Sequence, residues 1–415
     1  MIQKMDTHKL LYRARLFLEE GRYEAALKEL VAIGPVDEKQ QRDTDYLLGW
    51  CYVQLKQWND ALRVLSPLVK QISEHGEQGA LLERERLALH LLHLGIAAVN
   101  LSHYEDASQH FALCLKVLHD RRVHLPAVRI KARYSLGMTC IMRGLYTTAV
   151  RHYEEALRLC QHYRDEEELA HIYHGLCEVY RDMGDFARAD FAGHEALRRY
   201  QERADRSMEA RVHHLLGHNY FLVGDYRAAE DHYTTSLRLA MNYNSPKLVM
   251  LNYAALADVC LAEGRLQDAK YYCDLALEYM QRTNDAHMRS RTYLVIARVS
   301  HATARRAGGP ARRQLLEETI AWLEKAKEEL AQTQAYPDIA EVYESLALAW
   351  EDLGRVEEAI ACWRSGYESL SRTIELSDVP PQSRGFYTFA RADDTRTNVP
   401  DMHMKCLYGL KAIRV

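Results

Sequence analysis

The stretch that decides the fold repeats one six-residue pattern four times: Gly-Leu-Tyr-Thr-Thr-Ala at 144–149, Gly-Asp-Phe-Ala-Arg-Ala at 184–189, Gly-Asp-Tyr-Arg-Ala-Ala at 224–229 and Gly-Arg-Leu-Gln-Asp-Ala at 264–269. The closing alanine recurs every forty residues, as Ala149, Ala189, Ala229 and Ala269. A constant period between twenty and fifty residues is typical of proteins that stack one repeated unit. We therefore expect the chain to be built from such units.

One copy of the unit predicts two helices joined by a tight turn. Apolar residues recur at helical spacing from Leu169 to Tyr180. Gly184 predicts the end of this first helix, because glycine readily takes the left-handed conformation that closes helices. Asp185 can cap the second helix by accepting a hydrogen bond from a free backbone N–H. A single hairpin cannot bury its apolar face, so neighbouring copies must complete the core.

Weaker copies extend this pattern in both directions. We predict an all-α fold of about nine helical hairpins over residues 6–376, wound as a right-handed superhelical solenoid. An arginine-rich segment from Arg305 to Arg313 interrupts the pattern, and we interpret it as an insertion in a loop. The tail, residues 377–415, shows no period. A short helix from Asp401 to Ile413 is expected there, as a cap for the last repeat.

The pattern resembles that of the tetratricopeptide repeat family. The family signature has a Leu-Gly pair and an aromatic residue on the first helix, as at Leu216-Gly217 and Tyr220, then Gly-x-aromatic-x-x-Ala at the turn. The period is six residues longer than the family's usual thirty-four, which lengthens each helix by nearly a turn. Repeats of this length resemble those of bacterial peptide-sensing regulators and kinesin light chains. The resemblance implies a solenoid that binds a protein or peptide.

The resemblance also implies where a partner binds. In this family the first helix of each repeat lines a concave groove, and the exposed positions are those offset from the Leu-Gly pair. That register selects ten residues here: Tyr134, His171, His174, Glu178, Arg181, Arg211, His214, His218, Asp258 and Arg298. A groove with both signs of charge suits a peptide or a partner helix. We expect these residues to serve recognition rather than stability, with histidines that titrate near pH 6.5.

Composition narrows the class of protein. The formal net charge of −4 does not favour a nucleic-acid-binding surface. Nine scattered cysteines without a Cys-x-x-Cys pair predict buried thiols in a reducing compartment. The first residues carry no apolar signal region, and no apolar run is long enough to span a membrane. We therefore expect a cytoplasmic protein with no membrane segment.

The motifs point away from catalysis. The sequence has no phosphate-binding glycine loop, no Gly-x-Ser-x-Gly and no His-Glu-x-x-His, so we expect no enzyme activity, cofactor or metal. The leading interpretation is a regulator whose groove binds a peptide or partner segment, with oligomers left open. The alternative is an accessory subunit of an enzyme, or an enzyme whose chemistry lies in the groove histidines or in residues 382–415.

Overall fold

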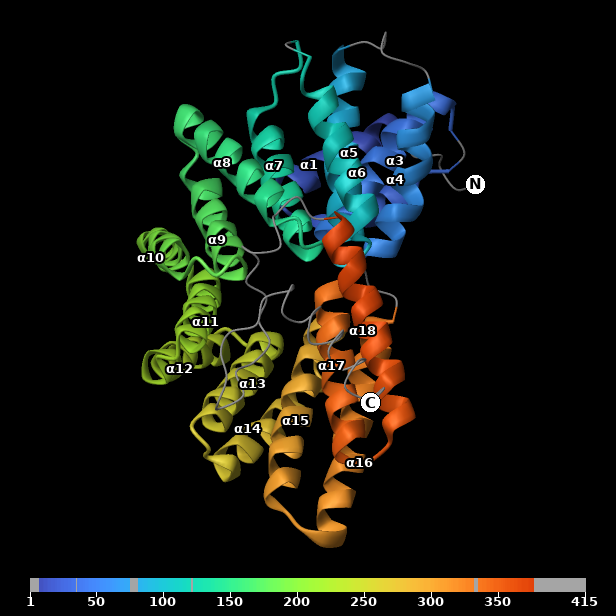
Figure 1. The fold of residues 1–415 in the computed structure, drawn as a ribbon. Coiled ribbons are helices and arrows are strands. Elements are labelled where there is room, and N and C mark those ends of the chain that lie inside the picture. Colours follow the sequence, from blue (N-terminus) through green and yellow to red (C-terminus); the bar gives the residue numbers. More distant parts are fainter. Residues whose placement is uncertain (1–6, 35, 75–80, 121, 332–334, 377–415) are drawn as a thin grey trace. The chain divides into compact units, whose positions relative to one another are not determined.

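The computed structural model describes residues 7–34, 36–74, 81–120, 122–331 and 335–376, and these residues form an all-α fold (Figure 1). The described part contains eighteen helices and no strand, which confirms the predicted fold class. The tail helix expected between Asp401 and Ile413 lies outside the described residues. The helices are α1 (Thr7–Glu19), α2 (Tyr23–Val31), α3 (Glu38–Gln54), α4 (Trp58–Glu74), α5 (Leu81–Asn100), α6 (Tyr104–Val117), α7 (Pro126–Met142), α8 (Tyr146–Tyr163), α9 (Glu166–Asp182), α10 (Phe186–Glu202), α11 (Arg206–Val223), α12 (Tyr226–Asn242), α13 (Pro246–Ala262), α14 (Leu266–Met280), α15 (Ala286–Arg306), α16 (Gly309–Leu330), α17 (Tyr336–Asp352) and α18 (Val356–Leu376).

The helices form two compact units. Residues 1–139 and 154–164 make the first, and residues 140–153 and 165–415 make the second. The first unit contains α1 to α6 and the second contains α9 to α18, while α7 and α8 contribute to both. Within each unit consecutive helices pack in pairs, such as α5 with α6 and α11 with α12. These pairs are the hairpins that the forty-residue period predicts.

A glycine in the left-handed region closes each regular turn of the second unit. The φ angles of Gly184 and Gly224 are 77° and 83°. The next residue then caps the second helix. The Asp185 carboxylate accepts a hydrogen bond from the backbone N–H of Arg188 at 3.1 Å, and Asp225 does the same for Ala228 at 3.0 Å. The predicted cap at Asp185 is therefore confirmed.

A second left-handed residue connects one hairpin to the next, and the sequence did not reveal it. It falls at Arg164, Ala204 and Asn244, with φ of 56°, 55° and 55°. These positions are also forty residues apart. An N-cap residue follows each of them, and the side chains of Asp165 and Asp205 accept a backbone hydrogen bond from three residues further on. Because none of the three is glycine, no composition signal marked this connection.

The small residues of the pattern sit where helices touch. The four alanines of the period, Ala149, Ala189, Ala229 and Ala269, are fully buried. At Gly217 an added Cβ would lie 2.8 Å from the ring of Tyr233 on the second helix of the same hairpin. The glycine of the Leu-Gly pair thus leaves room for an aromatic ring to pack on the first-helix backbone.

One hairpin, α15–α16, departs from the others, and we call it the extended hairpin. Its helices have 21 and 22 residues, whereas α13 and α17 on either side have 17 each. Only residues 307–308 connect the two helices. The prediction that the extra residues form a loop is therefore wrong, because they lengthen both helices instead. Arg305 ends up in the last turn of α15, and Arg312 and Arg313 in the first turns of α16.

The structure also bears on the predictions about the cysteines and about membrane-spanning segments. Of the eight cysteines in the described residues, seven are buried and none is disulfide-bonded. Burial raises the pKa of thiols such as Cys51, to about 12. These are inert core residues, as predicted. None of the described helices combines the length and the apolar character that crossing a membrane requires.

Candidate functional site

The second unit has five hairpins, and the first helices of four of them, α9, α11, α13 and α15, carry nine of the ten predicted groove residues. These helices pack in series: α9 against α11, α11 against α13, α13 against α15 and α15 against α17. We use the term inner face for the predicted polar side chains on these helices. It also includes the polar groups that contact these side chains or shift their pKa values. The tenth predicted residue, Tyr134, lies on α7 in the first unit and is not part of it.

Arg298 on α15 bridges carboxylates from the helices on both sides. Its Nη2 donates to both oxygens of Asp258 on α13, each at 2.8 Å, and its Nη1 donates to Glu341 on α17 at 3.3 Å. Burial raises the pKa of Asp258 to about 6 and that of Glu341 to about 8, although Arg298 pulls both down. One cation thus serves two buried carboxyl groups, and Glu341 holds its proton near neutral pH.

His214 and His218 on α11 are part of the packed interior rather than of an open groove wall. Nδ1 of His214 lies 2.9 Å from Oδ1 of Asn252, whose Nδ2 donates to Ser236 at 2.8 Å. Burial lowers the pKa of His214 to about 4, and burial with nearby arginines lowers that of His218 well below its ordinary value. Both rings are therefore neutral at physiological pH. The expectation that they titrate near 6.5 and do not contribute to packing is wrong.

The predicted residues on α9 are already engaged locally. Nδ1 of His171 lies 2.7 Å from the hydroxyl of Tyr200 on the second helix of the same hairpin. His174 and Glu178 lie one turn apart, with 3.6 Å between Nε2 and Oε1. Arg181 pairs with its neighbour Asp182 at 2.7 Å. Glu178, His174 and Arg181 remain half-buried and polar, which keeps them available to a ligand.

Arg291 on α15 is the residue that sequence reasoning missed. It forms no hydrogen bond or ion pair with any described residue, yet its positive charge lowers the pKa of Asp182, His214, Asp258 and Glu341. Those four residues lie on α9, α11, α13 and α17. Arg291 is therefore a cation without an ion-pair partner among the described residues, within electrostatic reach of all four neighbouring first helices. The signal was available, since Arg291 lies seven residues, two helical turns, before Arg298.

The inner face has no metal-binding geometry. Among the described residues, no group of three or more His, Cys, Asp or Glu side chains could hold a metal ion. The contacts described above instead join His174 to Glu178, aspartates to arginine, His171 to Tyr200 and His214 to Asn252. The arrangement can present charge-assisted hydrogen bonds to a ligand from several consecutive repeats.

Comparison with known proteins supports the repeat assignment. A family model described as tetratricopeptide repeat matches residues 129–202 and 168–242. The predicted resemblance to this family is therefore confirmed over residues 129–242. None of the curated proteins that were compared matches the chain in sequence.

Several solved structures share the fold at low sequence identity. A Rap protein complexed with competence and sporulation factor has a TM-score of 0.64 at 14% identity, covering 89% of this chain and 96% of that one. NprR in complex with its cognate peptide NprX has a TM-score of 0.60 at 16% identity, covering 89% and 100%. The apo quorum sensor NprR from B. thuringiensis has a TM-score of 0.58 at 14% identity, covering 88% and 97%. These similarities show a common repeat architecture.

Proposed function

We propose that this protein is a non-catalytic, cytoplasmic regulator that binds a peptide, or a peptide-like segment of a partner, along the inner face. The observation that carries the proposal is the row of polar side chains on five consecutive first helices, with Arg291 among them and without an ion-pair partner in the described structure. Two of the structurally similar proteins were solved with a peptide or a factor bound, which supports the same kind of ligand.

Arg291 suggests the charge of that ligand. Two nearby cations are compensated, since Arg298 pairs with Asp258 and Arg181 pairs with Asp182. Arg291, like Arg211 on α11, can pair with an incoming carboxylate while displacing no ion pair of the described structure. A guanidinium pairs with a carboxylate through two parallel hydrogen bonds, a geometry that lysine cannot supply. We therefore propose a peptide with an acidic side chain or a free carboxyl end at this position.

The test starts with a pull-down from native lysate, followed by mass spectrometry to identify the bound peptide or protein. Titration calorimetry then compares the native protein with Arg291→Ala, which is expected to weaken binding about tenfold through loss of the charged hydrogen bonds. Arg289→Ala is the matched control, because Arg289 lies on the same helix but pairs with Glu329 on α16 at 2.6 Å. If the native protein and Arg291→Ala bound the ligand with equal affinity, the proposal that the ligand pairs with Arg291 on the inner face would be wrong.

The alternative, an enzyme or an enzyme's accessory subunit, is favoured by one observation. Carboxyl groups with raised pKa values, such as Asp258 and Glu341, are common in active sites. Burial around a shared arginine also produces such values, without any chemistry. Glu341→Gln separates the two: an enzyme would lose turnover of its substrate, whereas a binding protein would keep its ligand affinity within about twofold, because Glu341 is uncharged near neutral pH.

A further inference from the structure

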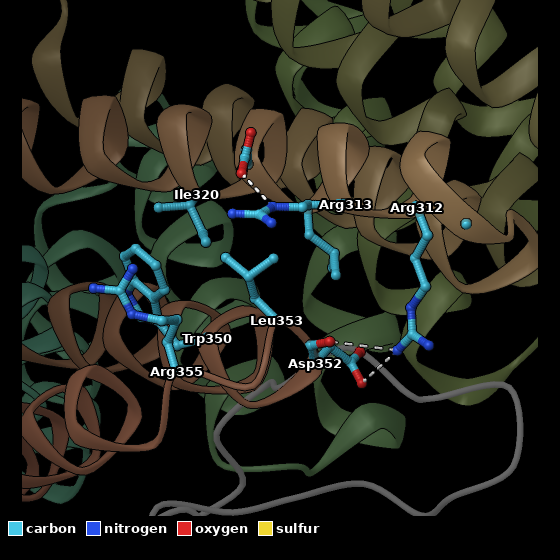
Figure 2. Close-up of a pocket in the computed structure, with 10 residues that line it drawn as sticks. Arg312, Arg313, Ile320, Trp350, Asp352, Leu353 and Arg355 are labelled. Atoms are coloured by element: carbon cyan, nitrogen blue, oxygen red, sulfur yellow. Dashed lines mark hydrogen bonds and ion pairs between the residues drawn. The ribbon is translucent and has the colours of Figure 1, made fainter.

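The extended hairpin borders a cavity of about 530 Å³ (Figure 2). One wall is the N-terminal half of α16, and the other is the end of α17 with the turn into α18. Cavities of this size hold a few side chains of a peptide. The cavity lies between α16 and the α17–α18 turn, and its lining residues do not include those of the inner face described above.

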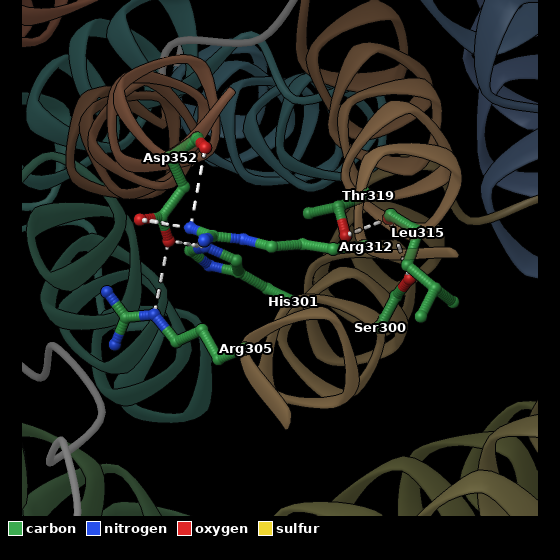
Figure 3. Close-up of polar contacts among 7 residues, drawn as sticks. All are labelled: Ser300, His301, Arg305, Arg312, Leu315, Thr319 and Asp352. Atoms are coloured by element: carbon green, nitrogen blue, oxygen red, sulfur yellow. Dashed lines mark hydrogen bonds and ion pairs between the residues drawn. The ribbon is translucent and has the colours of Figure 1, made fainter. Parts of the chain in front are cut away.

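The cavity lies at the end of the extended hairpin where α15 and α16 are joined. Ser300 on α15 donates to the backbone oxygen of Leu315 on α16 at 3.3 Å, which joins the two helices near this end (Figure 3). The first turn of α16 therefore continues alongside the point where α17 ends. Its N-cap, Gly308, offers no side-chain hydrogen bond, and the next residue, Gly309, lines the cavity. The partial positive charge of this helix start is thus left for a ligand to use.

Asp352, the last residue of α17, fixes the arginines at this end of the hairpin. Its Oδ2 accepts from His301 at 2.7 Å and from Arg305 at 3.1 Å, and its Oδ1 lies 3.4 Å from Arg312 (Figure 3). Burial raises the pKa of Asp352, but the bonds from His301 and Arg305 outweigh this and hold it below its usual range. The carboxylate is therefore ionised and already supplied with donors. It orders the guanidinium groups without consuming all their N–H groups.

The remaining lining combines positive charge with an apolar floor. Arg313 lies beside Ile320 and near Leu353, and the guanidinium of Arg355 stands 5.6 Å from the ring centre of Trp350 (Figure 2). Arg313 bonds to Glu317 through Nε alone, at 3.0 Å. Cations thus rim a surface of aliphatic and aromatic groups. This combination matches a carboxylate beside an apolar side chain.

We propose that this cavity is a second binding site, for an acidic segment of a protein partner. A carboxylate of the segment pairs with Arg312 and Arg313, and an adjacent apolar side chain packs on Trp350 and Leu353.

The test uses a pentapeptide of four glutamates around a central leucine, capped at both ends. Trp350 is one of five tryptophans, so its indole N–H signal can be assigned with Trp350→Phe and followed by NMR. Titration is expected to shift this signal saturably, and more strongly at low salt. Arg312→Ala with Arg313→Ala is expected to weaken binding at least about tenfold.

The matched control is Arg198→Ala with Arg227→Ala, which removes the same charge from exposed positions on α10 and α12. It should bind the peptide within about twofold of the native protein. If both double variants weakened peptide binding equally, the cause would be the overall charge of the protein, and the proposed site would be wrong. The proposal also fails if a glutamine version of the peptide binds equally well. It fails too if a single-stranded oligonucleotide shifts Trp350 and the acidic peptide does not.

Discussion

The regular hairpins α9–α10 and α11–α12 and the extended hairpin α15–α16 are closed in different ways. In the regular hairpins, a left-handed glycine ends the first helix and an aspartate caps the second, as at Gly224 and Asp225. In the extended hairpin α15 ends at Arg306, its C-cap Ala307 has extended backbone angles, and the next helix starts without a side-chain cap. Its arginines bond to the turns of other hairpins instead, as Arg306 does to the backbone oxygen of Gly264. The regular turns are therefore stabilised by residues within the turn itself. The extended hairpin is stabilised by contacts with residues far away in the sequence.

The largest difference between the two regions should appear on enlarging an alanine. Ala229 is fully buried between helices of a regular hairpin, so Ala229→Leu is expected to lower the free energy of unfolding by roughly 1–3 kcal/mol through overpacking. Ala311 in the first turn of α16 is exposed, and Ala311→Leu should change it by less than about 0.5 kcal/mol. Urea denaturation measures both. Similar losses at the two sites would show that the first turn of α16 is packed as tightly as the repeat core.

The next effect is a pH dependence that arises where the extended hairpin meets α17. Burial raises the pKa of Glu341 from 4.5 to about 8, so the folded protein holds this proton more tightly than the unfolded chain. The associated stability is complete below about pH 4.5 and is lost as pH rises through about 8. Glu341→Gln cannot ionise. It should unfold nearly like the native protein at pH 5 and be more stable than the native protein at pH 8.5, by at least about 1 kcal/mol.

Thermal unfolding at both pH values tests this, with Glu344→Gln on the same helix as the matched substitution. A difference between native protein and Glu341→Gln that is the same at pH 5 and 8.5 would mean that Glu341 does not titrate in this range.

A smaller effect is expected at the caps of regular hairpins. Asp225→Ala removes the hydrogen bond to the Ala228 N–H and should cost about 1 kcal/mol. Ser245 occupies an N-cap but makes no side-chain cap bond, so Ser245→Ala should cost much less. Chemical denaturation of the two variants side by side gives the comparison. A loss for Ser245→Ala as large as that for Asp225→Ala would argue against the cap bond as the cause.

The smallest effect concerns the connections between hairpins. Ala204 holds a left-handed conformation with φ of 55°, which strains any residue with a Cβ. Ala204→Gly should therefore raise stability by about 0.5 kcal/mol, even though glycine usually destabilises. Ala302→Gly, inside α15 of the extended hairpin, should instead lose about 1 kcal/mol. Calorimetric melting would contradict this explanation if both variants moved in the same direction.

The regular part of the fold was readable because each feature had a local cause. The alternation of apolar residues, the glycine at 184 and the aspartate at 185 each report on backbone needs within a few residues. The extended hairpin was misread because its helical ends depend on Asp352, forty residues beyond Arg312. The links at Arg164 and Ala204 were missed because arginine and alanine are residue types that do not favour a left-handed backbone.

Nine of the predicted groove residues lie on first helices of the second unit, but the sequence did not predict the surroundings of their side chains. The repeat pattern predicts which side of a first helix faces away from the second helix of the same hairpin. It does not predict whether the next repeat covers that side. His218 is covered in this way, and only 8% of the residue is exposed. Arg291 was missed because only its charged neighbours on other helices distinguish it from other arginines, and the sequence does not show these neighbours. Whether the inner face binds a ligand remains a prediction.

The connections at Ala204 and Asn244 have a consequence for the length of this molecule. Each is a left-handed residue followed by the N-cap of the next first helix, and they are forty residues apart. Deleting residues 205–244 would join Ala204 to Ser245, recreating a left-handed residue followed by an N-cap. Duplicating the same segment would do likewise. The chain can therefore gain or lose one repeat at these connections while keeping the backbone geometry that joins consecutive hairpins.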